Sequence, residues 1–242
     1  AENYMQAVLA KFSKDLEAGL KVNITAPKLK KAIQTFNQIR SNLQRLYTLR
    51  SERSAPFSSS DLQAIVKASL VMDRDDLAER MAEICSWLDG YHHEPRIEKK
   101  PLVLSGGICS MPDIYQQIED AGATVVGDDC CTGSRHFEGT IDLRDDPLRA
   151  IGQRYFERIN CPAKHRDCFS RGDFLLKRVE KTRARGVVFV TLKFCDPHAF
   201  DYPYLKEFLD RAGVPNILLE IEGQQISKEQ LKTRIEAFIE LL

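Results

Sequence analysis

Pro101-Leu-Val-Leu-Ser105 is a short apolar run, and Gly106-Gly107 and then an amphipathic stretch from Met111 to Ala121 follow it. The run has the length of a strand buried on both faces, and the stretch has helical spacing. The alternation recurs toward the C-terminus, with apolar runs at Ala123–Gly127, Gly186–Leu192 and Asn216–Glu220 and helices expected at 147–158, 171–184, 202–212 and 228–242. Strands that alternate with helices predict parallel pairing and right-handed crossovers. We therefore expect an α/β fold over residues 98–242, with a four-stranded, doubly wound parallel sheet of the Rossmann or flavodoxin type.

Residues 1–97 have a different pattern, which predicts a helical segment ahead of the sheet. Between Pro27 and Arg50, apolar residues recur every three or four positions and so share one helical face. The residues from Ser58 to Asp61 can cap the start of a helix that runs to Met72, and another helix is expected from Arg74 to near Gly90. No motif in this segment carries chemistry, and we expect its apolar stripes to form core.

Composition excludes several functional classes. The 242 residues are 43% hydrophobic and 29% charged, as in ordinary globular domains. The 35 basic residues balance the 35 acidic ones, so no field of one sign would attract nucleic acid or a membrane surface. No apolar run approaches the roughly 20 residues that span a bilayer, and the charged N-terminus is not a signal peptide. We expect a cytoplasmic protein without nucleic-acid or membrane partners, and, because residue 1 is not Met and lies within a helical pattern, a part of a longer chain.

Seven cysteines are present, at positions 85, 109, 130, 131, 161, 168 and 195. Their odd number and the lack of an export signal argue against a disulfide framework. Each thiol is then either a small buried hydrophobe or a metal ligand. Four of them, Cys109, Cys130, Cys131 and Cys195, directly follow predicted strands. Because ligands bind outside the carboxyl ends of the strands in such sheets, we expect a site at this edge.

Other residues at the same strand ends allow two interpretations each. Gly106 and Gly107 fit a tight turn or close contact with a phosphate. The pair Asp128-Asp129 fits a helix cap or a solvated turn. Arg135 can pair with these carboxylates or with a phosphate of a ligand.

Cys195 stands out among the thiols. It follows an apolar strand, and Asp196-Pro197 stops the chain from continuing as strand, so the thiol should face the ligand crevice. His198 fits a capped surface imidazole better than a catalytic base. The spacing of Cys161 and Cys168, with His165 between them, is not that of a zinc knuckle, so zinc is disfavoured there.

Four segments carry a resemblance to a known family. They are LSGGICSMPDIYQQIEDAGATVVGDDCCTGSR (104–135), DPLRAIGQRY (146–155), KFCDPHAFDYPYLKEFLDRAGVPNILLEIE (193–222) and QLKTRIEAFIELL (230–242). Together they resemble the 2-hydroxyacyl-CoA dehydratase and benzoyl-CoA reductase family from about residue 100 to the end. The KFCDP and TRIEAF segments are specific in combination.

The resemblance implies two similar sheet domains with a [4Fe–4S] cluster between them. It makes Cys195, at the KFCD position, a cluster ligand. Cys131, next to Thr132-Gly133, matches the cysteine of the second family segment better than Cys130 does and is the second expected ligand. The other ligands are expected mainly in an N-terminal domain outside these residues. By themselves, the 242 residues would then lack the cluster and be inactive.

The implied function is that of an iron–sulfur subunit, its C-terminal part, in a complex that reduces a CoA thioester by one electron. Dehydratases of this type then eliminate water, whereas aryl-CoA reductases reduce a ring. The implied partners are a homologous second subunit, an ATP-dependent activator iron–sulfur protein and the CoA thioester. The amides of Gly106 and Gly107, together with Arg135 and Lys193, are expected to bind the CoA pyrophosphate. Two alternatives stay open: a double-cubane-type electron-transfer reductase of the same family, and a non-catalytic domain that docks a partner subunit.

Overall fold

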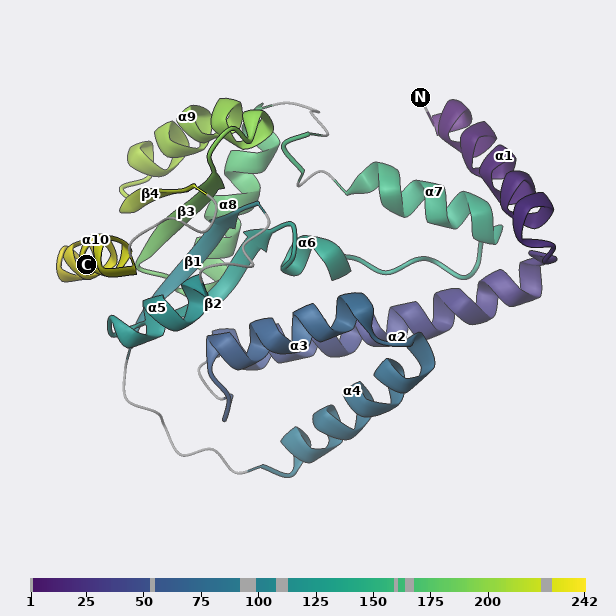
Figure 1. Cartoon of the computed structure of the whole chain (residues 1–242), viewed down its shortest axis with the longest axis horizontal. Helices are drawn as coiled ribbons and strands as arrows, with labels where there is room; N and C mark the ends of the chain where they lie inside the picture. The colour runs from purple at the N-terminus through teal and green to yellow at the C-terminus, as the bar shows by residue number, and fades with distance from the viewer. Residues whose placement is uncertain are drawn as a thin grey trace.

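The computed structural model describes residues 2–52, 55–91, 99–107, 113–158, 161–163, 168–222 and 228–242. Its centre is a sheet of four parallel strands in the order β2-β1-β3-β4 (Figure 1). The strands are β1 (Lys100–Gly106), β2 (Ala123–Cys130), β3 (Gly186–Leu192) and β4 (Asn216–Ile221). The predicted α/β class and parallel sheet are confirmed, although β2 continues beyond Gly127 to Cys130.

Helices cover both faces of the sheet because successive strand residues point to opposite sides. On one face, α5 (Ile114–Asp120) and α10 (Lys228–Glu240) pack over Leu102, Leu104, Val188 and Val190. On the other face, α8 (Cys168–Thr182) and α9 (Asp196–Arg211) pack over Val103, Val187 and Phe189. Both faces of each central strand are therefore buried, which explains the continuous apolar runs.

The N-terminal residues form α1 (Glu2–Leu20), α2 (Ala26–Ser51), α3 (Ser59–Val71) and α4 (Arg74–Asp89), as the apolar spacing predicts. The predicted capped start of α3 is confirmed, since Ser58 and Asp61 form a reciprocal capping box. Helices α2, α3 and α4 share a core of their own around Leu43, Leu46 and Met81. Helix α2 also contacts β2, so it covers a strand edge that would otherwise expose unpaired backbone groups (Figure 1).

Two helices that follow β2 lie with the N-terminal helices. Helix α6 (Ser134–Phe137) contacts α2, and α7 (Pro147–Glu157) lies beside α1 (Figure 1). The expected division into residues 1–97 and 98–242 therefore stays a prediction, because chain from the second part completes the packing of the first. No helix among the described residues is long and apolar enough to cross a bilayer.

A buried ion pair fastens the helical segment to the sheet. Glu119, at the end of α5, accepts hydrogen bonds from Ser59 and pairs with Arg50 at 2.9 Å. Burial raises the pKa of this carboxyl, but the Ser59 bonds, the charge of Arg50 and the hydrogen bond from Lys99 lower it to about 2. The carboxylate is therefore ionised throughout the physiological range.

The expected start of the helix at residue 202 is wrong, because α9 begins at Asp196. Pro197 lies in its first turn, where the missing N–H is not needed. Pro203 lies inside the helix, so this proline does not mark its beginning. The earlier start places residues 196–201 on a helix directly after β3.

Gly106 allows β1 and β3 to approach closely, because a Cβ at this position would lie 2.1 Å from the Val190 carbonyl oxygen. We expect Gly106→Ala to lower the free energy of unfolding by about 2–3 kcal/mol or more, because backbone must move to relieve the clash. The matched control is Gly19→Ala, where a Cβ meets nothing within 4 Å. It should leave stability unchanged or raise it by up to about 1 kcal/mol. Chemical denaturation measures both, and equal stabilities would contradict the close approach.

Candidate functional site

The strand order identifies one position at the carboxyl edge of the sheet as the place for a ligand. From β1 the chain crosses to β2 on one side, and it then returns past β1 to β3 on the other side. The topological switch point therefore lies between β1 and β3, where doubly wound sheets bind ligands. Gly107 follows β1 there, while Cys195 and His198 follow β3.

The backbone of Gly107 forms hydrogen bonds on both sides of β1, one to β3 and one to the residue after β2. The Gly107 N–H donates to the Val190 carbonyl at 3.3 Å, and the Cys131 N–H donates to the Gly107 carbonyl at 3.2 Å. The His198 ring lies 3.6 Å from the position that a Cβ of Gly107 would occupy. Gly106 is the last residue of β1 and Gly107 begins the bend that follows it, and the interpretation as a tight turn stays a prediction because residues 108–112 lie outside the described part of the chain. Because the Gly107 amide is already used, contact of this turn with a phosphate stays a prediction.

The centre of the site is Asp129, which is 1% exposed at the end of β2. Arg135 from α6 donates to both of its carboxylate oxygens, at 2.6 and 2.9 Å, and to its carbonyl at 2.8 Å. Arg171 from α8 donates to the same carboxylate at 3.1 Å and to Asp201 of α9 at 2.5 Å. We call Asp129, Arg135, Arg171 and Asp201 the buried charge network. It joins β2, α6, α8 and α9 at the switch-point edge.

Electrostatics keep Asp129 and Arg135 ionised. Burial raises the pKa of Asp129, but the charges of Arg135 and Arg171 lower it to about 2. Burial lowers the pKa of Arg135, yet the Asp129 carboxylate outweighs this effect and raises it above its usual range. Removing one member of such a network leaves an unpaired buried charge, which costs about 3–5 kcal/mol.

Asp128 points to the other side of β2 and is equally buried. It accepts hydrogen bonds from the Tyr47 hydroxyl of α2 and, at 2.7 Å, from the Ser134 N–H that begins α6. A side chain at Gly133 would come within 2.2 Å of the same carboxylate. Of the two interpretations of Asp128-Asp129, the solvated turn is wrong because both residues are buried at the end of a strand, whereas Asp128 does bond to the first N–H of a helix.

The four described thiols of the second half differ in exposure. Cys130 is fully buried in the sheet core, whereas Cys131 is exposed and Cys195 and Cys161 are half-buried. Cys130 thus has the surroundings of a small hydrophobe. Cys131 follows β2 and its N–H bonds to Gly107, whereas Cys195 follows β3 on the other side of β1. Cys109, Cys168 and His165, or their side chains, lie outside the described part of the structure.

Burial raises the pKa of the Cys131 thiol, and the nearby Cys161 raises it further, while the charge of Arg135 lowers it. Arg135 also donates to the Cys131 sulfur at 3.4 Å. This contact links the exposed thiol to the buried charge network. Cys195 is the N-cap of α9, and its N–H donates to the Leu192 carbonyl at 3.0 Å.

His198 is buried against the Gly107 turn, so the interpretation as a surface imidazole is wrong. Burial, together with the charges of Arg135 and Arg171, lowers its pKa to about 4. The ring is therefore neutral at physiological pH. It can accept or donate one hydrogen bond at the switch point without adding charge.

Lys193 and Phe194 follow β3 and are exposed at this edge of the sheet. The Lys193 ammonium pairs with Glu222 at 2.8 Å and lies 5.5 Å from the centre of the Phe194 ring. Phe194 is 85% exposed and has a φ of 68°, a left-handed conformation that bulky residues rarely adopt. Such strain tends to occur at functional sites. A role of Lys193 in binding substrate stays a prediction.

Sequence reasoning missed Arg171 and Asp201, although a signal was present. Arg171 precedes Leu175 and Val179 at helical spacing, and Asp201 likewise precedes Leu205 and Leu209. Each charge therefore lies at the end of an apolar stripe that faces the sheet. Charges in that position predict a buried pair.

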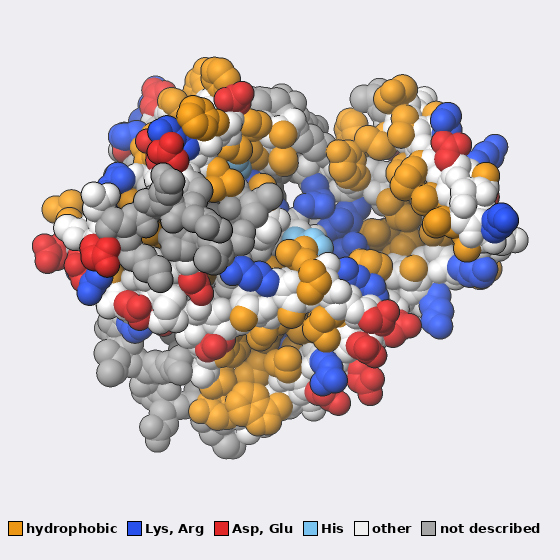
Figure 2. Space-filling view, in the orientation of Figure 1, with side chains coloured by type: hydrophobic (Ala, Val, Ile, Leu, Met, Phe, Trp, Pro, Cys, Tyr) orange, Lys and Arg blue, Asp and Glu red, His pale blue; other side chains and the backbone are white. Residues whose placement is uncertain are grey.

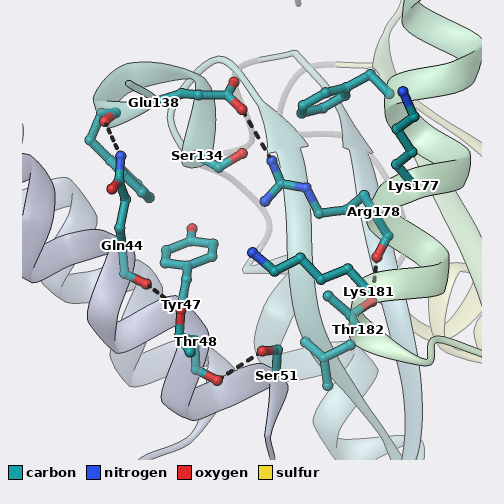
Figure 3. Close-up of a pocket in the computed structure, with 13 residues that line it drawn as sticks. Gln44, Tyr47, Thr48, Ser51, Ser134, Glu138, Lys177, Arg178, Lys181 and Thr182 are labelled. Atoms are coloured by element: carbon teal, nitrogen blue, oxygen red, sulfur yellow. Dashed lines mark hydrogen bonds and ion pairs between the residues drawn. The ribbon is translucent and has the colours of Figure 1, made fainter. Parts of the chain in front are cut away.

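A separate cavity of about 390 Å³ lies between α2 and α8 beside β2 (Figure 3). Arg178 and Lys181 reach into it from α8, opposite Gln44 and Tyr47 of α2. Glu138 pairs with Arg178 across its rim at 3.6 Å. This pair offsets part of the positive charge in the cavity.

The titration of His198 gives a testable pH dependence. Its pKa is lowered from 6.5 to about 4 in the folded state, so the unfolded chain binds more protons between these values. Stability is therefore full above pH 6.5 and should fall by about 3 kcal/mol as the pH drops toward 4. We expect His198→Gln to flatten the unfolding free energy between about pH 5.5 and 6.5, because the unfolded chain begins to protonate the carboxyls of Glu119 and Asp129 only below this range. Burial and four arginines lower the pKa of His136 as well, so His136→Gln is the control that separates the two. An unchanged slope in His198→Gln would contradict the burial of this ring as a neutral group.

Comparison with known proteins places this geometry in a family. The chain is 26% identical to the (R)-phenyllactyl-CoA dehydratase beta subunit of Clostridium sporogenes over 90% of its length and 58% of the relative. It is 26% identical to the beta subunit of the (R)-2-hydroxyglutaryl-CoA dehydratase of Acidaminococcus fermentans, over 90% of the chain and 59% of the relative. It is also 26% identical to a subunit of the benzoyl-CoA reductase of Thauera aromatica, over 89% of the chain and 56% of the relative.

The chain thus spans less than two thirds of the length of these relatives. The family model described as 2-hydroxyglutaryl-CoA dehydratase, D-component, matches residues 1–242. The match covers the helical segment as well as the sheet and its cysteine-bearing edge. The chain belongs to the family of the 2-hydroxyglutaryl-CoA dehydratase D-component.

Proposed function

We propose that this chain acts as an iron–sulfur subunit of a complex that transfers one electron to a CoA thioester, in a reaction of the dehydratase or benzoyl-CoA reductase type. The observation that carries the proposal is that Cys131 follows β2 and Cys195 follows β3, the two strands that neighbour β1 at the carboxyl edge of the sheet. The names of the relatives support the same class of reaction, since they are subunits of enzymes that act on CoA thioesters.

Cysteine thiols are the right type of ligand for an iron–sulfur cluster, but these two thiols are fewer than such a cluster needs. Soft thiolate ligands select iron–sulfur clusters among the common metal groups, and a four-iron cluster is held by cysteine thiolates. No group of three or more metal-binding side chains converges within the described residues. In the proposal, Cys131 and Cys195 are therefore two of the ligands, and the others come from outside the described part of the chain. Bound there, the cluster would supply low-potential single electrons.

The residues around the thiols have roles of their own in this proposal. The buried charge network holds the loops after β2 and β3 in place, so that the two thiols keep their separation. In the proposal, the neutral His198 ring packs against Gly107 and keeps water from the switch point. The exposed Phe194 and the Lys193–Glu222 pair mark the side on which a partner or substrate would arrive.

The proposed partners follow from the same chemistry. A homologous second subunit would complete the complex, and an ATP-dependent activator with its own iron–sulfur cluster would deliver the electron. Support for a partner subunit comes from the relatives, each of which is named as one subunit of its enzyme.

Iron analysis of the anaerobically purified full-length protein tests the proposal. We expect iron and sulfide in the wild type, and a loss of at least half of the iron in Cys195→Ala and in Cys131→Ala. Cys130→Ala and Cys85→Ala are matched controls, because both thiols are buried among apolar side chains, Cys85 in the helical core and Cys130 in the sheet core although it ends β2 next to Cys131. Their iron content should equal that of the wild type. A wild-type protein without iron would sink the proposal, and full iron content in Cys195→Ala would refute the ligand assignment.

A further inference from the structure

A cluster of arginines lies where α2, α4, α6 and α7 meet, outside the site described above. It consists of Arg40 on α2, Arg74 at the start of α4, and Arg154 and Arg158 at the end of α7, around His136 of α6. All five side chains are half-buried. Figure 2 shows Lys and Arg side chains gathered beside a histidine in the hollow between the sheet and the α1/α7 helices.

The contacts of these side chains bring them to one place. The guanidinium groups of Arg40 and Arg74 each lie 5.4 Å from the centre of the same ring, Phe36. Arg154 donates to the carbonyls of Glu138 and Gly139 at 2.6 and 3.2 Å, just after His136. Arg158 donates to the Arg135 carbonyl, just before His136.

The positive charges act on one another across this junction. Burial and the charge of Arg158 lower the pKa of Arg40. Burial, then Arg40 and Arg158, lower the pKa of Arg154 to about 10. Burial and all four arginines lower the pKa of His136. Bringing cations together in this way is unfavourable unless an anion joins them.

Among the residues that the structure describes, no carboxylate pairs with Arg40, Arg74 or Arg154, and the charge of Glu138 offsets that of Arg154 only in part. The hydrogen bonds of these three arginines go to carbonyl groups and to the Asn37 side chain. Each guanidinium has five N–H donors, so each of the three has donors to spare. Planar guanidinium forks match phosphate oxygens, and several of them side by side match a ligand with more than one phosphate.

We infer that this cluster, Arg40, Arg74, Arg154 and Arg158, binds the phosphate groups of the CoA moiety. The inference rests on the proposed function, in which the substrate is a CoA thioester. It assigns the phosphate contacts to this cluster in place of the residues that the sequence suggested, Arg135 and Lys193 among them. Arg135 already donates to Asp129 from two of its nitrogens, and the Lys193 ammonium is paired with Glu222. Arg158 contacts the carbonyl of Arg135, which itself contacts Cys131, so the cluster lies next to the thiol edge. A CoA held by its phosphates here would have its flexible pantetheine arm free to reach that edge.

Binding measurements on the full-length protein test this inference. By calorimetry, the wild type should bind a CoA thioester at least about tenfold more tightly than the thioester of the same acid with pantetheine, which lacks the nucleotide phosphates. Inorganic pyrophosphate should compete with the CoA thioester and leave the pantetheine thioester unaffected. Equal affinities for the two thioesters in the wild type would overturn the inference without any variant.

Variants locate the phosphates. We expect Arg40→Gln to weaken binding of the CoA thioester roughly tenfold and the double variant Arg40→Gln/Arg154→Gln further, with no effect on the pantetheine thioester. Arg40 is the primary test, because its hydrogen bond is a local one to Asn37, whereas Arg154 also supports backbone. The control is Arg211→Gln on α9, an exposed arginine paired with Glu207. Unchanged CoA affinity in Arg40→Gln and in the double variant would overturn the inference. If the wild type binds neither thioester, the result counts against the proposed function and not against the cluster. Competition between pyrophosphate and a second anion for binding to the protein would then still test the cluster.

Discussion

The carboxylate of Asp129 is the constraint on which the rest of the site depends. It lies at the end of an edge strand, is nearly inaccessible to solvent, and receives two guanidinium groups. One guanidinium comes from the short helix after β2 and the other from α8, which leads to β3. Arg171 also forms an ion pair with Asp201 in the helix after β3. A single ionised group thus sets the positions of three chain segments that carry Cys131, Cys161 and Cys195 toward the same edge.

The neighbouring Asp128 extends this constraint to the other half of the molecule. Consecutive residues of a strand point to opposite sides, so two adjacent aspartates can serve two different networks. Asp128 accepts hydrogen bonds from the Tyr47 hydroxyl of α2 and from the first N–H of α6. Asp129 accepts hydrogen bonds from one arginine of α6 and one of α8. Gly133 is needed because any side chain there would meet the Asp128 carboxylate. The helical segment and the sheet are therefore connected through residues 128–133, which also carry the exposed thiol of Cys131.

Much of the fold could be predicted because the apolar runs are unambiguous. Gly186–Leu192 is buried on both faces, as its apolar run predicts, and Ser58 with Asp61 marks a helix start by its own chemistry. The site was harder, because its geometry depends on long-range pairing. Asp129 and Arg171 are far apart in sequence, and their distance follows only from the packing of α8 on β2. The burial of His198 depends likewise on the start of α9 at Asp196, six residues before the expected start at 202.

Unfolding of an Asp129→Asn variant tests the central claim most directly. If the buried charge network holds the edge together, this nearly isosteric change leaves Arg135 and Arg171 without their carboxylate. The free energy of unfolding at neutral pH should then fall by about 3–5 kcal/mol. Asp142→Asn, which removes an exposed carboxylate paired with Arg144, should leave it unchanged. An Asp129→Asn protein as stable as the wild type would contradict the account.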